Sequence, residues 1–370
     1  MIQDKMLKPV ELGFQGRAGE YFRIWIVNIL LSILSLGIYS AWAKVRNKQY
    51  FYGNTILDGS PFEYNASPVA ILKGRLVVVA ILVMYSVTKY FYPLAEGIFL
   101  ILFFLVLPWL VMRSMMFNAR YSSYRNLNFS FNNNLSDSVK TFIGLGLLIP
   151  LTLGLIYPYY MHAIQKYRVN NHGYGQYIFR LKSVVKAFYK YYLLALLILF
   201  AVMFIAGLLT SLIFGASIGV LLGSGEPGTQ PGLNPGTVLS IFMMLGFYLI
   251  AYLVAAAYVK ARTFNAVWSN TSLEKAARPM FNTPDVPLMA FKGSLEFNKM
   301  FYIYFTNTIG IILSVGLLIP WAKVRLAKYR IENLHVASLA DLKVITAQQQ
   351  DQVGTIGSEM GDILDIEIGM

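Results

Sequence analysis

The sequence lacks several kinds of residue that catalytic and metal sites need. It has no cysteine and only three histidines among 370 residues. Without thiols there is no disulfide, thiolate catalysis or cysteine-ligated zinc, and no histidine stands at the spacing of a zinc hydrolase. Glycine-rich phosphate loops, nucleophile elbows and kinase motifs are also missing. We therefore predict that the protein is not an enzyme, with no catalytic residue, no metal site and no cofactor.

Charge is also scarce. Charged residues make up 13% of the chain, about half of the ~25% that is usual in soluble domains. Hydrophobic residues make up 56%, the mean hydropathy is +0.55, and the apolar residues are gathered in long runs. A soluble chain of this length has too much surface to hide such runs, whereas a bilayer covers them. The composition predicts an integral membrane protein.

Seven apolar runs approach or exceed the ~20 residues that a helix needs to cross the hydrocarbon core. In lipid each backbone N–H and C=O must be paired within its own segment, so we expect a helix for every run. The predicted fold is an all-α polytopic membrane protein with about seven hydrophobic helices. The runs cover residues 22–42, 76–95, 97–113, 141–161, 191–222, 237–259 and 300–321.

The first and last runs end in the same motif. The pentapeptide Trp-Ala-Lys-Val-Arg begins at Trp42 and again at Trp321, a constant offset of 279 residues. A weaker copy around Gly154 keeps a following tyrosine and asparagine but lacks the two cations. This pattern predicts internal repeats, in which motif helices alternate with helix pairs. The motif helices are expected at 22–42, 141–161 and 300–321, and the helix pairs at 76–113 and 191–259.

The segments Gly37–Thr55 and Leu57–Tyr64, which contain this motif and the stretch Leu-Asp-Gly-Ser-Pro-Phe-Glu-Tyr, are similar to the YjgN-like family of inner-membrane proteins. The resemblance extends from about Phe14 to His335. That family is a domain of unknown function. The resemblance therefore implies a multi-pass location in a bacterial inner membrane and carries over no catalytic or binding residue.

These patterns divide the chain into three parts. We expect a cytoplasmic N-terminal segment at 1–21, a membrane domain at 22–335 and an acidic, mostly disordered tail at 336–370. The dipeptide Asp58-Gly59 lies between two short stretches and predicts a β-hairpin turn. We expect small cytoplasmic hairpins of this kind, packed on the repeats.

The distribution of Lys and Arg raises a conflict over which runs cross the membrane. Basic loops stay in the cytoplasm, yet basic residues flank the runs 22–42, 141–161 and 300–321 on both sides. Two interpretations remain. The plain one, favoured by run length, is seven ordinary crossings with some basic loops outside. The other is that these three runs are re-entrant or steeply broken helices that return to the cytoplasmic side.

The repeated motif supplies six candidate binding residues. Two cations and an indole suit an anionic headgroup, but tryptophan and basic residues also anchor helices at the membrane interface. We favour the interface interpretation. Anionic headgroups of membrane lipids are the expected partners in either case. The candidate lipid-interface or ligand residues are Trp42, Lys44, Arg46, Trp321, Lys323 and Arg325.

Asn28 and Asn307 occupy equivalent positions inside the first and last runs. Amide side chains at such depth either hydrogen-bond between helices, for about 0.6–2 kcal/mol, or line a solute path. We favour the structural role. A polar cavity near these residues would instead favour transport.

The basic excess of 31 Lys and Arg over 18 Asp and Glu does not predict nucleic-acid binding, because the cations lie between apolar runs and no recognisable binding fold accompanies them. Many transporters are built from internal repeats that meet at a central site. Our leading hypothesis is therefore transport or permeation of a small solute or lipid. The alternative is a structural or regulatory membrane protein without transport activity.

Overall fold

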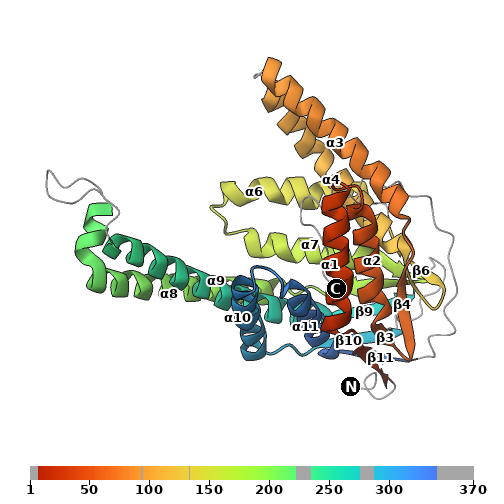
Figure 1. Ribbon diagram of the computed structural model, residues 1–370. Coiled ribbons are helices and arrows are strands. Elements are labelled where there is room, and N and C mark those ends of the chain that lie inside the picture. The colour runs from red at the N-terminus through yellow and green to blue at the C-terminus, as the bar shows by residue number, and fades with distance from the viewer. Residues whose placement is uncertain (1–6, 93–94, 133, 222–234, 276–286, 340–370) are drawn as a thin grey trace. The chain divides into compact units, whose positions relative to one another are not determined.

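The computed structural model describes residues 7–92, 95–132, 134–221, 235–275 and 287–339, which form two compact units (Figure 1). One unit comprises residues 1–185, 266–294 and 319–370 and contains the strands. The other comprises residues 186–265 and 295–318 and is helical. The loop 222–234 and most of the predicted acidic tail lie outside the described residues. The start of that tail was predicted wrongly, because residues 336–338 belong to a strand.

The described elements alternate between helices and short strands. The helices are α1 (Ala18–Leu34), α2 (Ser40–Gly53), α3 (Pro68–Phe91), α4 (Ala95–Tyr121), α5 (Leu135–Val139), a π-helical turn (Lys140–Gly144), α6 (Leu145–Leu151), α7 (Tyr157–Asn171), α8 (Val185–Leu221), α9 (Pro235–Trp268), α10 (Phe297–Leu313) and α11 (Ile319–Glu332). The strands are β1 (Lys8–Val10), β2 (Leu12–Phe14), β3 (Thr55–Leu57), β4 (Ser60–Tyr64), β5 (Ser122–Tyr124), β6 (Leu127–Phe131), β7 (His172–Tyr174), β8 (Tyr177–Leu181), β9 (Thr271–Lys275), β10 (Met289–Gly293) and β11 (Leu334–Ser338).

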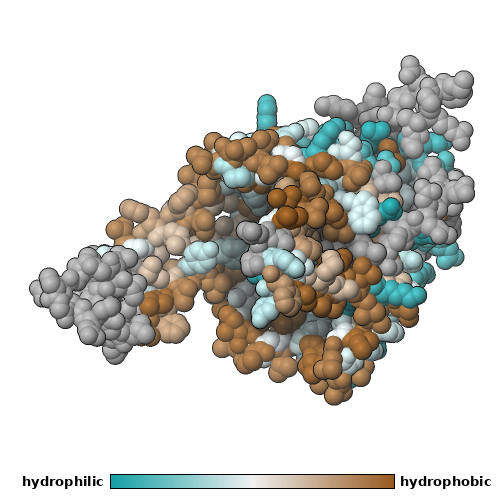
Figure 2. Space-filling view, turned by 90° about the horizontal axis from the view of Figure 1, so that it is seen from above, coloured by the Kyte–Doolittle hydropathy of each residue, from teal (hydrophilic) through white to brown (hydrophobic). Residues whose placement is uncertain are grey.

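Four of the described helices, α3, α4, α8 and α9, are long and apolar enough to cross a membrane. Only 11–33% of their most apolar windows is buried within the protein, so most of that surface remains available to lipid. Figure 2 shows apolar side chains over much of the face that is turned to the viewer. The prediction of about seven hydrophobic helices is therefore wrong.

The three remaining runs are each broken near the middle. The runs 22–42, 141–161 and 300–321 contain a turn in which a non-glycine residue with φ near +50° precedes a glycine with φ between +82° and +91°. The three residue pairs are Leu36-Gly37, Leu153-Gly154 and Val315-Gly316. Glycine adopts this left-handed backbone without the steric cost of a Cβ. Each run consequently forms two shorter helices, and the sequence pattern of hydrophobicity alone did not separate them.

The prediction of an all-α fold with separate small hairpins is wrong, because the strands form one eleven-stranded antiparallel sheet. Its order is β1-β11-β10-β9-β8-β7-β6-β5-β4-β3-β2. The predicted Asp58-Gly59 turn is present between β3 and β4, and both of its residues have positive φ. The hairpin nevertheless pairs on both sides, with β2 and with β5. The expectation of isolated hairpins failed because the pairing partners lie up to hundreds of residues apart in the chain.

The N-terminal strand closes the sheet. β1 and β2 stand at opposite ends of the strand order, yet only Glu11 separates them in the chain. Val10 pairs with Val336 of β11, whereas Leu12 pairs with Leu57 of β3. The backbone N–H of Asp58 also donates to the Glu11 carbonyl at 2.9 Å. A single extended segment thus joins the first and last parts of the sheet, which leaves no long unpaired edge.

Side chains from every strand fill the interior of this closed sheet. The buried centre of the cluster includes Tyr124, Tyr174 and Leu273. The Tyr124 hydroxyl donates to the Leu57 carbonyl at 2.7 Å, and the Tyr174 hydroxyl donates to the Tyr124 carbonyl at 2.8 Å. Burial raises the pKa of Tyr174 to about 12, so its hydroxyl keeps its proton. Other members of the cluster are Val10, Leu12, Leu57, Phe62, Leu127, Phe129, Tyr177, Phe179, Leu288, Met289, Phe291 and Val336.

The same junction joins helix to strand at several points around the sheet. An asparagine at the end of the helix donates from Nδ2 to the carbonyl four residues earlier, at 2.8 Å in each case. This contact satisfies a carbonyl that the helix end leaves unpaired. The carbonyl of the same asparagine then accepts from a backbone N–H that follows a strand, at 2.8–3.0 Å. The four asparagines are Asn54, Asn171, Asn270 and Asn333.

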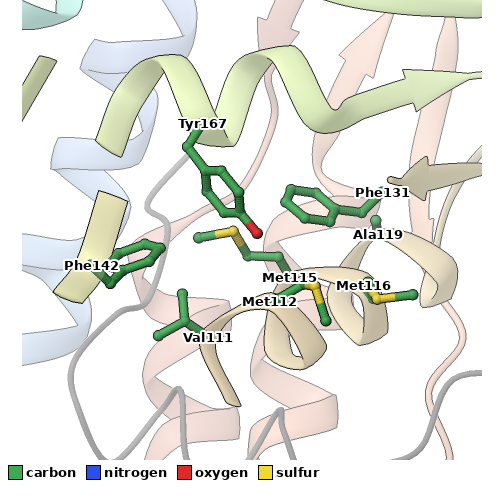
Figure 3. Close-up of a cluster of buried hydrophobic side chains, with 8 residues drawn as sticks. All are labelled: Val111, Met112, Met115, Met116, Ala119, Phe131, Phe142 and Tyr167. Carbon is green, nitrogen blue, oxygen red and sulfur yellow. The ribbon is translucent and has the colours of Figure 1, made fainter. Parts of the chain in front are cut away.

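A methionine-rich cluster attaches the middle broken helix to α4. Met112, Met115 and Met116 of α4 pack against aromatic rings from three other elements (Figure 3). The Tyr167 ring of α7 lies edge-to-face with Phe131 of β6, at 5.8 Å between centroids, and with Phe142 at 5.6 Å. Flexible thioether side chains fill the irregular gaps between such rings. This packing fixes α7 beside the sheet.

Candidate functional site

A cleft of about 340 Å³ lies between α1, α2 and α11, all within the first unit. One of its walls is apolar and belongs to α1, while amide, hydroxyl and ammonium groups face it from the three helices. The residues that line it are Trp25, Asn28, Ile29, Ser32 and Ile33 of α1, Ala43 and Asn47 of α2, and Lys323 of α11.

Asn28 is the most buried polar residue of this cleft, with 3% of its surface exposed. Its Nδ2 donates to Asn47 Oδ1 at 3.1 Å and approaches the Ala43 carbonyl at 3.5 Å. Its Oδ1 is buried and has no hydrogen-bond partner among the described residues. A buried acceptor without a partner costs free energy, about 1–3 kcal/mol. A ligand that donates a hydrogen bond here would recover that cost.

Lys323 is the one charged residue among those that line the cleft. It reaches this position because α11 packs along α1: Val324 is buried with Phe14 and Tyr21, and Ile331 extends the same contact. Val324 and Lys323 therefore lie on different faces of α11, with Val324 buried and Lys323 exposed. The cleft therefore carries a positive charge that no carboxylate within it neutralises.

Tyr50 holds the start of α1 against α2. Its hydroxyl accepts from the Arg17 N–H at 2.7 Å and donates to the Arg17 carbonyl at 2.7 Å. Burial raises the pKa of Tyr50, which keeps the hydroxyl protonated and able to donate. The Tyr50 ring also stacks on Tyr21 at 5.1 Å between centroids. These contacts fix the register of the two helices that carry Asn28 and Asn47.

The six motif residues do not form one site. Trp42 packs against the buried cluster of Tyr64, Ile71 and Phe117 and stacks on Tyr39. Arg46 donates to the Tyr39 hydroxyl at 3.0 Å, and Lys44 is half-buried on α2.

On α11 the guanidinium of Arg325 lies 4.9 Å from the centre of the Trp321 ring, a cation–π contact. Of the six, only Lys323 lines the cleft.

The two asparagines that were predicted to lie within the membrane have different surroundings. Asn28 lines the cleft, whereas Asn307 is buried in α10 of the second unit and is not among the lining residues. Two residues of the cleft, Asn47 and Trp25, were not predicted from the sequence. Asn47 directly follows the repeated motif, but the equivalent position in the last copy is Leu326, so the repeat did not single it out.

The donor set of the cleft fits an amphiphilic anion better than a metal ion. An ammonium pairs with an anionic group, an amide carbonyl accepts from a hydroxyl or amine, and the α1 wall accommodates hydrocarbon. Within the described ranges, no group of three or more histidine, aspartate or glutamate residues is placed to hold a metal.

Known proteins provide an independent comparison. Residues 9–363 match a family model described as bacterial protein of unknown function (DUF898), which extends beyond the region of resemblance predicted above. The chain is 29% identical over 146 residues to the inner membrane protein YjgN of Salmonella typhimurium, and 28% identical over 148 residues to that of Escherichia coli O157:H7. These matches cover 39% of this chain and 37% and 36% of the relatives, so they span well under half of either protein.

No solved structure matches the chain. The predicted resemblance to the YjgN-like family is confirmed by these relatives, whose names place them in the inner membrane and state no activity. Because the family model covers nearly the whole sequence, the chain belongs to the DUF898 family of bacterial proteins of unknown function.

Proposed function

We propose that this protein is a multi-pass protein of the bacterial inner membrane that binds an anionic phospholipid in the α1–α2–α11 cleft and moves it between leaflets. The favoured headgroup carries a phosphate and a free hydroxyl, as in phosphatidylglycerol. The proposal involves no covalent conversion of the lipid, in keeping with a role other than that of an enzyme. Anionic lipid is thus both the partner and the transported substrate.

The observation that carries this proposal is the unpaired Oδ1 of Asn28 in a cleft that Lys323 lines. The phosphate would pair with Lys323 and the headgroup hydroxyl would donate to Asn28. One acyl chain would lie against Ile29 and Ile33. A polar cavity beside Asn28 is the feature that the transport hypothesis required, whereas a solid apolar interior would have favoured the structural role.

The distribution of charge supports an orientation with the sheet in the cytoplasm. The joint between α3 and α4 carries Glu96, whose carboxylate pairs with Lys89 at 2.8 Å. The loops that contain the strands carry most of the Lys and Arg. Cytoplasmic loops collect basic residues, so we place the joint outside and the strands inside, with α3, α4, α8 and α9 as the four crossings.

Internal repeats support a transport role as well. The three αL–glycine turns and the asparagine junctions recur with nearly identical geometry. Transporters of several folds bind their substrate between repeated units, near the midplane of the membrane. Here α1 from the first copy and α11 from the last copy line the same cleft.

Lipid retention measured by native mass spectrometry tests the binding step. Purified protein would be mixed with equal amounts of phosphatidylglycerol and phosphatidylcholine, and we expect preferential retention of phosphatidylglycerol. A charge-assisted contact contributes about 1.5–3 kcal/mol, so Lys323→Gln should weaken retention about tenfold or more. Asn28→Asp should weaken it too, because an added carboxylate repels phosphate.

Arg325→Gln is the matched control, since it removes the same charge from the same helix outside the cleft. Equal loss in Lys323→Gln and Arg325→Gln would show that bulk charge, rather than this cleft, retains the lipid. Movement between leaflets would be followed with a fluorescent phosphatidylglycerol in proteoliposomes and dithionite quenching of the outer leaflet. Binding without movement would leave a lipid-binding protein and refute transport.

A structural or regulatory role is the second candidate. The closed sheet with its filled interior favours it, because such a core holds several membrane helices in one arrangement. This role predicts that cleft variants keep every measured property of the parent protein.

A further inference from the structure

The three αL–glycine turns carry the most exposed apolar side chains of the broken helices. Leu36, Leu153 and Val315 are 95%, 93% and 92% exposed. The residues two positions before and two positions after each of them are also exposed and apolar. Each turn therefore presents a tip of three apolar side chains. The tips are Leu34, Leu36 and Ile38; Leu151, Leu153 and Leu155; and Leu313, Val315 and Leu317.

The backbone of each tip pairs its own polar groups. In the first, the Gly37 N–H donates to the Ser32 carbonyl at 2.7 Å and the Ile38 N–H donates to the Ser35 carbonyl at 3.1 Å. The Ser35 hydroxyl then accepts from the N–H of Tyr39, at 2.8 Å, as the next helix begins.

The other two tips repeat all three contacts, with Thr152 and Ser314 in the place of Ser35. Because these N–H groups are paired within the turn, they need no water, which suits the turn to hydrocarbon.

The closed sheet determines how often each helical segment can cross the membrane. All strands belong to one hydrogen-bonded sheet, and strands cannot pair through a bilayer, so every strand lies on the same side. The chain leaves this sheet and returns to it between β2 and β3, between β6 and β7, and between β10 and β11. Each of these segments therefore begins and ends on the same side of the membrane, so it cannot make a single crossing. The basic residues on both flanks of each run agree with this conclusion.

The length of the arms limits how deep the tips reach. From Arg23 to Leu34 the helix α1 advances about 11 residues, or about 17 Å at 1.5 Å per residue. Lys140 and Leu151 are equally far apart in sequence. Half of the ~30 Å hydrocarbon core is about 15 Å, so both of these arms span about one leaflet and fall short of two. On the return side, Lys44 follows Leu36 by only eight residues.

We infer that α1–α2, α6–α7 and α10–α11 are re-entrant wedges, whose tips insert among the acyl chains of the cytoplasmic leaflet and return without crossing. This interaction surface is separate from the lipid-binding cleft and does not depend on it. The three wedges and four crossings together account for all seven apolar runs. The plain interpretation of seven crossings conflicts with the single closed sheet.

Site-directed fluorescence tests the wedges without removing any native cysteine, because the chain has none. A bimane probe would be attached to Leu36→Cys, Leu153→Cys or Val315→Cys in vesicles of phosphatidylcholine and phosphatidylglycerol. We expect nitroxide groups on the acyl chains to quench all three probes, and aqueous iodide to quench them at least fivefold less than a probe at Glu20→Cys. Glu20 lies on α1 near its cytoplasmic start and is the matched control.

Labelling of intact cells with an impermeant maleimide would provide the second measurement. Glu96→Cys should react from outside, whereas Asn171→Cys and Asn54→Cys should react only after the cells are opened. Reaction of Asn171→Cys in intact cells would overturn the inference, because that residue would then have crossed with α7. Tip probes that iodide quenches and nitroxide lipids do not would also overturn it. Tip probes that neither reagent quenches, together with cross-links between copies of the chain, would also overturn it. The tips would then contact a second copy of the chain and not lipid.

Discussion

The two tyrosine hydroxyls inside the closed sheet provide the sharpest test of the fold. The change is Tyr124→Phe or Tyr174→Phe. Either substitution keeps the ring and its volume but removes the donor that satisfies a buried carbonyl, that of Leu57 or of Tyr124. An unsatisfied buried acceptor costs about 1–3 kcal/mol, provided that no water reaches it. The filled interior of the sheet leaves only 2% of Tyr124 and 5% of Tyr174 exposed.

Hydrogen exchange followed by mass spectrometry would measure this cost in detergent or nanodiscs. A loss of 1–3 kcal/mol in the opening free energy corresponds to about 5- to 150-fold faster exchange of the protected amides in β3, β5 and β7. Tyr177→Phe is the control, because Tyr177 is only half-buried at the edge of the same cluster. Unchanged exchange in both buried variants would mean that water enters the sheet, and the description of a dry, filled interior would be wrong.

Two further predictions concern β7 and its neighbours. Gly173→Ala should destabilise the sheet by about 1–3 kcal/mol, because a Cβ would stand 2.7 Å from Ser130 Oγ and 3.0 Å from a backbone carbonyl. Thermal unfolding measures this loss of stability. Gly53→Ala is the control, because its Cβ would meet nothing within 4 Å. Burial lowers the pKa of His172 to about 4. Neutral imidazole is therefore favoured in the fold, and stability should fall as the pH drops from about 6.5 towards 4. His172→Gln should reduce that pH dependence; an unchanged dependence would contradict the assignment.

The four long apolar helices could be predicted from the sequence, whereas breaks in the other three apolar runs were predicted only as the less favoured of two interpretations. Hydropathy identified α3, α4, α8 and α9, because ~20 apolar residues leave few alternatives. The breaks at Leu36, Leu153 and Val315 depend on left-handed backbone at non-glycine residues, which apolar composition does not indicate. The glycine that follows each of these residues could be seen in the sequence. That it forms part of a left-handed turn became clear only from the backbone angles.

The closed sheet was missed for a different reason. Its strands have three to five residues, too few for alternation to stand out from the adjoining helices. Their partners are distant in the chain, as in the pairing of Val10 with Val336. The tyrosine–asparagine spacing that accompanies the repeat was noticed, but its role in ending helices above a strand became evident only from the hydrogen bonds at Asn54, Asn171 and Asn333.

The candidate site was predicted in part. The repeat singled out Asn28 and Lys323, which lie on opposite sides of one cleft. It also singled out Trp42 and Arg325, whose partners are aromatic rings. A motif shared by two copies reports their common packing, and only the contact between α1 and α11 decides which of its residues reach a ligand.

The pairing of Val10 with Val336 also sets the order of events during biogenesis. β11 follows every described helix in the chain, so it is the last of these elements to emerge from the ribosome. Until then β1 has no β11 to pair with, because that partner is synthesised some 330 residues later. The sheet can therefore become continuous only after all of the described helices have been synthesised. Chains stopped before β11 would leave β1 without its partner and one edge of β10 open, both exposed to capture by chaperones or proteases.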